Sequence, residues 1–477
     1  MSEKKKLTFV EKLSYGVGAV GKDMVYMLSA SYVLYYFQDV LGVSAVAMGV
    51  ILMAARVFDA FNDPVMGVIV AKTRTRWGKF RPWLFIGTLT NAVILFIMFS
   101  CPPTLDGPGL VAYAAVTYIL WGVTYTMMDI PYWSMIPAFT EGGREREGLT
   151  TLARSCAGVG SAIITVVTML AVQWLGSAIA GGSATAREIE RTGFRYFALI
   201  VAVLFVIFIT FTCIAIKEKS TVNMETASVG DMFRALLRND QTVAVVVAIV
   251  LINTAVYITS NLVIYFFKYD FGGSGWYNGY TLFNIFGGAI QILSMMLIFP
   301  LLRRKFTSIR IFFIALGSAM IGYAVLLALA FTSMKNVFIL FIPGFFIFAA
   351  SGVLQVLTTV FLANTVDYGE LKNGRRDESV IFSMQTFVVK LASGVAAFIA
   401  SITLAIFSLS SDAVTEAEQT MDFSRAVADG SKVGLRMVMT LLPIAGLLFA
   451  FFWFKKKYIL TDEKVEEIAA QVRKKHE

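Results

Sequence analysis

Three polar side chains interrupt an apolar stretch near the start of the chain. The segment RVFDAFNDPVMG (56–67) carries Asp59, Asn62 and Asp63, and the residues on both sides of it are apolar, as in a membrane-spanning helix. A carboxylate near the centre of a spanning helix costs about 2.5–3.5 kcal/mol. Asp59 and Asp63 are four residues apart and share a helix face, with Asn62 close to it. These oxygens suit a small hard cation, which would relieve the repulsion between the carboxylates. The alternative is a structural ion pair with a base such as Arg56.

A second group lies in TYTMMDIPYWSMIP (124–137), where Tyr125, Asp129 and Trp133 recur every fourth residue and form one stripe. A buried carboxylate can accept hydrogen bonds from adjacent sugar hydroxyls, while an aromatic ring covers the apolar C–H face. This pattern indicates a ligand site, and the alternative is an aromatic belt with one structural acid. Thr126 points away from the stripe, where its hydroxyl oxygen could complete the cation site.

Other ionisable residues fall inside apolar runs, where such groups indicate function. Lys22 could snorkel or pair with an acid, and Arg154 could bind sugar hydroxyls or neutralise Asp23 or Asp129. Lys390 stands out in the second half of the chain. Among the ionisable residues inside the spans, the acids outnumber the bases by one: Asp23, Asp59, Asp63 and Asp129 against Lys22, Arg154 and Lys390. A single bound cation would neutralise the excess negative charge.

Several classes of chemistry are excluded. The single histidine, His476, rules out an imidazole proton relay or a Ser-His-Asp triad, so proton coupling would need a carboxylate. GVGAVGKD (16–23) departs from a P-loop at Asp23. Three widely spaced cysteines give neither a disulfide framework nor a metal motif. The net charge of +9 is scattered in short clusters, which argues against nucleic acid. We therefore expect no enzyme activity and no cofactor.

The composition requires membrane helices to position these residues. Of the 477 residues, 57% are hydrophobic and 15% are charged, whereas soluble proteins carry about 25% charge. Runs of about 20 apolar residues suffice to cross a bilayer. The sequence predicts an all-α membrane protein with twelve transmembrane helices, at about 13–38, 43–70, 82–101, 110–138, 150–176, 194–216, 242–269, 278–302, 309–331, 337–364, 379–407 and 433–454.

Lys and Arg gather in alternate loops, which predicts cytoplasmic N- and C-termini. The N-terminal segment shows no cleavable signal. A central loop contains DMFRALLRND, a candidate surface helix, and each half repeats a basic loop between its second and third spans. Such symmetry is typical of transporters built from two halves. The predicted parts are a six-helix bundle (1–216), a central cytoplasmic loop (217–241), a second six-helix bundle (242–454) and a cytoplasmic tail (455–477).

Longer motifs extend over nearly the whole chain: KLSYGVGAVGKD, ARVFDAFNDPVMG, TRTRWGKFRPW, TYILWGVTYTMMDIPYW, REREGL, NTVDYGE and QTFVVK. Together they resemble the melibiose carriers of the glycoside–pentoside–hexuronide:cation symporter family, within the major facilitator superfamily. The resemblance implies the major facilitator fold and sugar transport coupled to a cation. It also implies that the loops TRTRWGKFRPW, REREGL and TVDYGELKNGRR hold an inner gate through charge contacts.

The resemblance assigns roles to matching positions. It implies a sodium site at Asp59, Asn62, Asp63 and Thr126. It implies that the sugar is lined in the first half by Lys22, Asp23, Tyr125, Asp129, Trp133 and Arg154. From the second half it implies further contacts by Gln385, Thr386, Val389 and Lys390.

Two positions depart from the family pattern. Gln355 stands where melibiose carriers have a sugar-side tryptophan, and Asn364 stands where they have an aspartate of the inner charge network. The first change questions melibiose itself, although Gln355 stays a candidate sugar contact and a galactoside-like ring stays plausible. Family members for uronic acids or pentoses tend to lack the acids that match Asp23 and Asp129, so their retention favours a neutral glycoside.

The expected function is symport of a neutral glycoside, a galactoside such as melibiose, with Na⁺ or else Li⁺ or H⁺, by alternating access. The expected setting is the bacterial inner membrane, where the chain acts as a monomer among lipids. Three alternatives stay open. They are proton coupling with another glycoside or pentoside, transport of a lipid or lysolipid, and a sugar sensor that does not transport.

Overall fold

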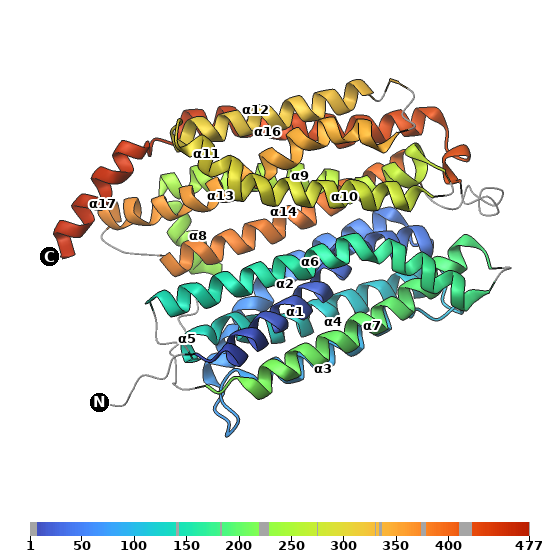
Figure 1. The fold of residues 1–477 in the computed structure, drawn as a ribbon, viewed down its shortest axis with the longest axis horizontal. Helices are drawn as coiled ribbons and strands as arrows, with labels where there is room; N and C mark the ends of the chain where they lie inside the picture. Colours follow the sequence, from blue (N-terminus) through green and yellow to red (C-terminus); the bar gives the residue numbers. More distant parts are fainter. Residues whose placement is uncertain are drawn as a thin grey trace. The chain divides into compact units, whose positions relative to one another are not determined.

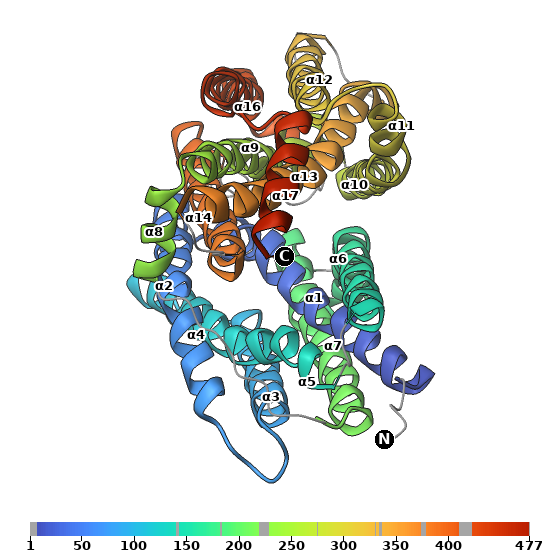
Figure 2. The same cartoon turned by 90° about the vertical axis from the view of Figure 1, so that its left-hand side faces the viewer.

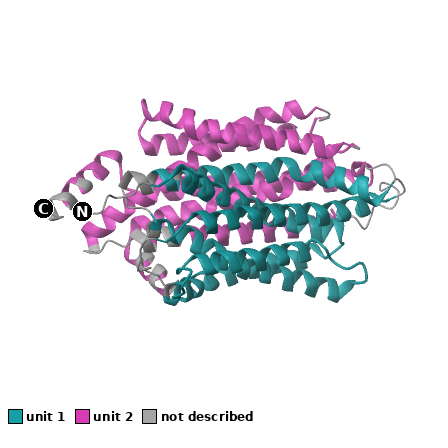
Figure 3. Cartoon of the chain, turned by 60° about the horizontal axis from the view of Figure 1, so that its bottom comes forward, with its two compact units in different colours: residues 1–226, 410–421 teal, residues 227–409, 422–477 magenta. Residues whose placement is uncertain are grey.

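The computed structural model describes residues 7–139, 143–181, 184–218, 229–273, 275–329, 331–332, 336–373, 378–409 and 422–476. Regular structure in these ranges is helical, apart from one isolated β-bridge between Thr75 and Gly78 (Figure 1). The chain forms two compact units, which Figure 3 colours separately. Unit 1 contains the described residues up to 218, and unit 2 contains those from 229 onward. The prediction of an all-helical protein is confirmed.

Unit 1 is built from long helices with clear start signals. Thr8 and Thr185 each form a capping box with a glutamate three residues later. Two helices carry proline in the first turn, where its missing N–H costs nothing. The elements are α1 (Phe9–Tyr35), η1 (Tyr36–Val40), α2 (Ala45–Lys72), α3 (Arg81–Met98), α4 (Gly107–Ser134), α5 (Ile136–Phe139), α6 (Gly143–Ala180) and α7 (Ala186–Ala215).

Unit 2 begins with a short helix that coincides with the predicted surface helix. Asn239 then caps the first long helix by accepting hydrogen bonds from the N–H groups of Gln241 and Thr242. The elements are α8 (Val229–Arg238), α9 (Asp240–Tyr265), η2 (Phe266–Phe271), α10 (Trp276–Leu293), η3 (Ser294–Ile298), α11 (Phe299–Arg303), α12 (Ser308–Leu329), α13 (Val337–Asn373), α14 (Glu378–Ile406), η5 (Phe423–Arg425), α16 (Asp429–Lys457) and α17 (Asp462–His476).

Eleven helical segments among the described residues are long and apolar enough to cross a membrane. The remaining predicted span, 13–38, coincides with α1, which has 27 residues and is long enough. The adjacent charges of Lys22 and Asp23 lie in its middle and lower its hydropathy. Most helices begin a few residues before the predicted spans, and four helices end beyond the predicted spans, because polar turns continue a helix past its apolar part. The clearest case is α13, which runs to Asn373.

Two groups of helices make up unit 1. Helix α1 packs on α6 and α7, while α4 packs on α2 and α3, and α3 joins the groups through α7 (Figure 2). Gly160 of α6 lies against the backbone carbonyl of Val20 in α1, where any larger side chain would clash. The contact between α1 and α6 therefore brings the two backbones very close together.

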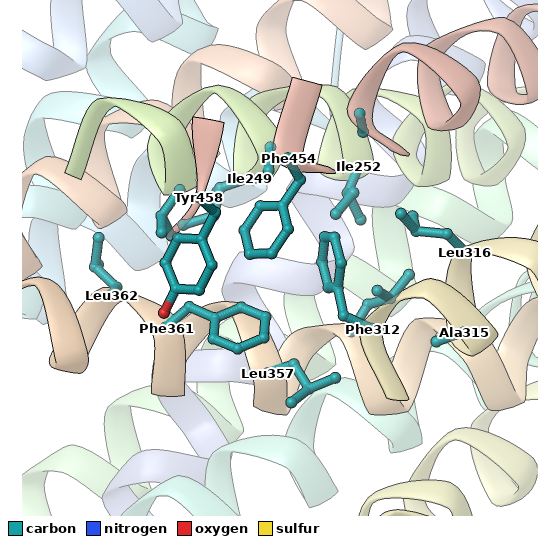
Figure 4. Packing of buried hydrophobic residues seen from close by; sticks show 14 of the residues in the cluster. Ile249, Ile252, Phe312, Ala315, Leu316, Leu357, Phe361, Leu362, Phe454 and Tyr458 are labelled. Atoms are coloured by element: carbon teal, nitrogen blue, oxygen red, sulfur yellow. The ribbon is translucent and has the colours of Figure 1, made fainter. Parts of the chain in front are cut away.

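The core of unit 2 is apolar and rich in aromatic rings. Figure 4 shows Phe312, Phe361, Phe454 and Tyr458 packed together from α12, α13, α16 and the residue after α16. Their ring centroids lie 4.2–5.5 Å apart in the contacting pairs. Val465 and Ile468 of α17 pack against the same cluster. The C-terminal helix is therefore part of this unit rather than a loose tail.

The first long helix of each unit ends in the same way. Helix α1 passes into the π-helix η1 and α9 into η2, and each is followed by a glycine with positive φ, Gly42 at 79° and Gly272 at 72°. Glycine adopts this conformation without a steric penalty. The same residue types precede both glycines at the same distances. They are Val33, Tyr35 and Phe37 before Gly42, and Val263, Tyr265 and Phe267 before Gly272. This is a stronger internal repeat than the basic loops.

Parts of three predicted loops lie outside the described residues. They are the side chains of 144–147 in REREGL, residues 374–377 after TVDYGELKN, and residues 410–421 between the last two predicted spans. In the loop TRTRWGKFRPW, the carboxylate of Glu218 accepts hydrogen bonds from the N–H groups of Lys79, Phe80 and Arg81, at 2.7–3.0 Å. This loop is therefore tied to the segment just after α7.

Candidate functional site

Lys22 lies between two carboxylates in unit 1. Its Nζ is 2.8 Å from Asp129 Oδ1 on α4 and 3.2 Å from Asp23 Oδ2 on its own helix. It also donates to the hydroxyl of Tyr125 at 3.0 Å. The lysine side chain is 5% exposed, whereas those of Asp23 and Asp129 are 19% and 28% exposed. A ligand could therefore reach the acids but not the ammonium group.

Aromatic rings surround this charged group. Lys22 Nζ lies 5.2–6.0 Å from the ring centroids of Tyr125, Tyr132 and Trp133, which is cation–π distance. Trp133 donates its Nε1–H to Asp129 Oδ1 at 3.1 Å. The predicted stripe of Tyr125, Asp129 and Trp133 therefore exists, and one lysine ties it to α1.

Arg154 from α6 completes the group. Its guanidinium carbon lies 4.0 Å from the centroid of Trp133, and its side chain is exposed. Ser161, two turns further along α6, donates to Asp23 Oδ1 at 3.4 Å. Carboxylate acceptors, guanidinium donors and an indole ring thus meet where α1, α4 and α6 contribute side chains. Such a set can bind the hydroxyls and the C–H face of a polyhydroxylated ligand.

The second predicted group lies where α2 meets α4. Thr126 donates its hydroxyl to Asp63 Oδ1 at 2.9 Å. The amide Nδ2 of Asn62 is buried, and none of the described residues accepts a hydrogen bond from it. Because amide nitrogen and oxygen are assigned by their surroundings, the reversed amide would place an oxygen acceptor here. Asn62, Asp63 and Thr126 therefore offer oxygen ligands of the kind that a hard cation prefers.

Asp59 has a basic partner. Arg56 Nη1 lies 3.3 Å from Asp59 Oδ2, and both residues are buried. This is the ion pair that stood as the structural alternative to a cation site. The other oxygen of Asp59 faces Gly122, where a Cβ atom would come within 2.7 Å. Asp59 and Asp63 on α2 thus face Gly122 and Thr126 on α4, one helical turn apart on each helix.

Counting only the charges of the two groups described above gives the same imbalance as the sequence analysis, with one change of partner. The four acids Asp23, Asp59, Asp63 and Asp129 stand against the three bases Lys22, Arg56 and Arg154. Arg56 takes the place in this count that the sequence analysis gave to Lys390. No group of three or more His, Cys, Asp or Glu side chains in the described residues is arranged to hold a metal ion.

The predicted residues of the second half lie on two helices of unit 2. Gln385, Thr386, Val389 and Lys390 belong to α14, and Gln355 belongs to α13. Gln385 Nε2 donates to Thr359 Oγ1 at 3.3 Å, one turn after Gln355. Val389 packs against the aromatic core of unit 2, and Thr386 is exposed. Gln355 and Gln385 therefore share one region of this unit.

Sequence reasoning missed several neighbours of the site. Trp121 and Tyr26 extend the aromatic group, with ring centroids 5.2 Å and 5.5 Å from Tyr125. Trp121 could have been found by continuing the four-residue stripe one step back. Ser161 and Tyr132 have no comparable signal, because nothing in their local sequence indicates which helix they face.

Comparisons with known proteins agree with this architecture. Residues 14–462 match the family model described as "MFS/sugar transport protein". The symporter YjmB of Bacillus subtilis, described as uncharacterized, is 26% identical over 99% of this chain and 96% of its own length. The raffinose carrier protein of Pediococcus pentosaceus is 28% identical over 97% and 71%. The isoprimeverose transporter of Lactiplantibacillus pentosus is 27% identical over 84% and 81%.

Solved structures show the same fold at low sequence identity. The nucleoside transporter NupG superposes with a TM-score of 0.64 at 12% identity, covering 94% of this chain and 99% of NupG. A D-xylose-proton symporter superposes with a TM-score of 0.60 at 16% identity, covering 93% and 97%. The expected major facilitator fold is confirmed. The chain is a multi-pass membrane transporter rather than an enzyme, and it belongs to the MFS/sugar transport protein family.

Proposed function

We propose that the chain is a symporter that couples uptake of a neutral glycoside to a monovalent cation by alternating access. The observation that carries this proposal is the pair of carboxylates, Asp23 and Asp129, shared by the single ammonium of Lys22 beside Trp133. Relatives described as a raffinose carrier protein, an isoprimeverose transporter and a symporter support sugar symport. The proposed setting is the bacterial inner membrane, with both termini in the cytoplasm.

The substrate chemistry follows from the exposed acceptors. Two partly exposed carboxylates can each accept hydrogen bonds from adjacent hydroxyls of one sugar ring. Arg154 supplies donors beside Trp133, and the indole ring offers an apolar surface. A uronic acid would bring a further negative charge toward Asp23 and Asp129, which like-charge repulsion opposes. We therefore propose a neutral glycoside, with galactosides such as melibiose as the first candidates.

The proposed coupling ion is Na⁺, bound by Asp63, Asn62 and Thr126 with Asp59 close by. The excess of one negative charge among the seven ionisable side chains of this region supports a single monovalent cation. Hard oxygen ligands suit Na⁺ or Li⁺, while H⁺ could occupy a carboxylate in its place. A membrane potential adds about 2.3 kcal/mol per charge per 100 mV to the driving force.

A panel of α- and β-galactosides, glucosides and xylosides tests the substrate. Binding to the purified protein is measured by calorimetry, each sugar with and without sodium. We expect one class of neutral glycoside to bind, and to bind more tightly with sodium. Absence of binding by every sugar in the panel would contradict the proposed site. If uptake does not depend on sodium but is abolished by a protonophore, the coupling ion is H⁺ rather than Na⁺.

Asp59→Cys separates the two roles that Asp59 could have. If Asp59 belongs to the cation site, this variant retains sugar binding and loses its stimulation by sodium. If Asp59 only neutralises Arg56, sodium stimulation survives the substitution. Calorimetric sugar titrations at two sodium concentrations distinguish these results, with Asp106→Cys, an acid at the N-cap of α4 outside the site, as the matched control.

A further inference from the structure

Two fully buried tyrosines form a reciprocal pair between α1 and α4. The hydroxyl of Tyr15 donates to the backbone carbonyl of Tyr132, and the hydroxyl of Tyr132 donates to the carbonyl of Tyr15, both at 2.5 Å. Their rings are stacked, with centroids 4.4 Å apart and planes 8° apart. Neither side chain is exposed. The site described above uses neither hydroxyl.

The pair links α1 and α4, which belong to the two different groups of helices in unit 1. Helix α1 rests on α6 and α7, and α4 rests on α2 and α3. Yet the proposed sugar site takes Lys22 and Asp23 from α1, and Asp129 and Trp133 from α4. Its geometry therefore depends on whatever fixes these two helices against each other. A flexible lysine side chain alone fixes this distance poorly, since it has several rotatable bonds.

The stacked pair lies close to that site along both helices. Tyr132 is the residue before Trp133 and follows Pro131, which has no N–H to donate within the helix. It lies in the last turn of α4, where carbonyl groups lack the full set of intrahelical donors. The phenol of Tyr15 supplies a donor to this carbonyl. The ring of Tyr132 is also 6.0 Å from Lys22 Nζ.

We propose that Tyr15 and Tyr132 are positioning residues for the sugar site. By joining α1 to the end of α4, the pair sets the distance at which Lys22 and Asp23 face Asp129 and Trp133. This inference rests on the proposed function, because its readout is sugar affinity. The pair does not touch the residues of the cation site, and α2 and α4 pack directly on each other.

The test removes one hydroxyl at a time and retains the ring, with Tyr15→Phe and Tyr132→Phe. Tyr36→Phe is the matched control, because Tyr36 is equally buried in the same unit and donates to the carbonyl of Phe99 at 3.0 Å. Each of the three variants loses one buried phenol-to-carbonyl hydrogen bond, so thermal stability should fall by similar amounts. Using two site variants keeps the test intact if one of them does not fold.

We expect the sugar dissociation constant to rise about tenfold in Tyr15→Phe and in Tyr132→Phe, the scale of one lost hydrogen bond. It should stay unchanged in Tyr36→Phe. The affinity for the coupling cation should stay at the wild-type value in all three, and the maximal transport rate should stay at the wild-type value in the control Tyr36→Phe. Wild-type sugar affinity in both site variants, or an equal loss in the control, would overturn the positioning role. A wild-type protein that binds no sugar would overturn the proposed function as well.

Discussion

Unit 1 buries charged side chains in the middle of its helices, whereas the core of unit 2 is an apolar cluster around aromatic rings. Lys22, Arg56 and Asp59 are 4–6% exposed and lie well inside α1 and α2. The core of unit 2 is instead built around Phe312, near the start of α12, Phe361 of α13 and Phe454, near the end of α16, which are at most 1% exposed. We propose from this difference that unit 1 supplies most of the ligand chemistry and that unit 2 supplies a packed body.

Unit 2 does contain buried charges, but they lie at a helix end. Asp270 in η2 is paired with Arg436 of α16, and Lys268 lies 4.3 Å from the ring centroid of Phe423. These contacts fasten the segment after residue 422 to the end of the first long helix of the unit. Charges at helix ends can thus be explained by the structure alone, whereas charges in the middle of a span indicate a ligand.

The largest expected effect comes from opening the core of unit 2. Phe361→Ala removes a ring that contacts Phe312, Phe454 and Tyr458. We expect the free energy of unfolding to fall by about 3 kcal/mol, as for other buried phenylalanines. Thermal unfolding measures this loss, and Phe338→Ala, at a 61% exposed position of the same helix, is the control. A change in sugar affinity without loss of stability would contradict the division between the units.

A pair of ion-paired aspartates, one in each unit, tests the division directly. Asp129→Asn should raise the sugar dissociation constant about a hundredfold, because charge-assisted hydrogen bonds are worth about 1.5–3 kcal/mol. Asp270→Asn should lower the melting temperature, because the substitution removes the carboxylate that pairs with Arg436. It should leave the sugar affinity unchanged. Calorimetric titration and thermal unfolding of both variants give the comparison. If both substitutions abolish sugar binding, the units do not divide the work in this way.

A smaller effect is expected at the junction of α2 and α4. Thr126→Val retains the shape of the side chain but removes the hydroxyl next to Asp63. We expect the sodium concentration for half-maximal sugar binding to rise about tenfold, the scale of one lost ligand or hydrogen bond. Thr124→Val is the control, since Thr124 lies on the same helix and bonds to Asn91 instead. Equal sodium dependence in the two variants would exclude Thr126 from the cation site.

The smallest expected effect is a pH dependence of stability that arises from Asp422, just before η5 in unit 2. Partial burial raises the pKa of Asp422, but hydrogen bonds from Ser424 and Gly273 and the nearby Arg425 outweigh it and hold the pKa below its ordinary value. The stability that Asp422 contributes is therefore present above its unfolded pKa of about 4 and is lost as the pH falls through the lower folded value. Melting temperatures between about pH 3 and 6 should fall more steeply for the wild type than for Asp422→Asn. Parallel curves would refute this.

The sequence predicted much of this architecture because apolar runs and polar interruptions are local signals. It located the spans within a few residues, and it placed Tyr125, Asp129 and Trp133 on one stripe. It left the partners of Lys22 open, since neighbours on a helix point in different directions and only a long side chain reaches both Asp23 and Asp129. It could not choose between Arg56 and a cation as the partner of Asp59. Such choices depend on which helices face each other, which periodicity does not specify.

The matching ends of α1 and α9 have a consequence for the course of the chain. Each has a π-helical turn closed by a glycine with positive φ, with the same valine, tyrosine and phenylalanine before it. A π-turn holds one residue more than an α-turn and rotates everything that follows by about 100°. A turn shared in this way is what a chain built from two repeated halves would carry. Both halves therefore redirect the chain in the same way after their first long helix.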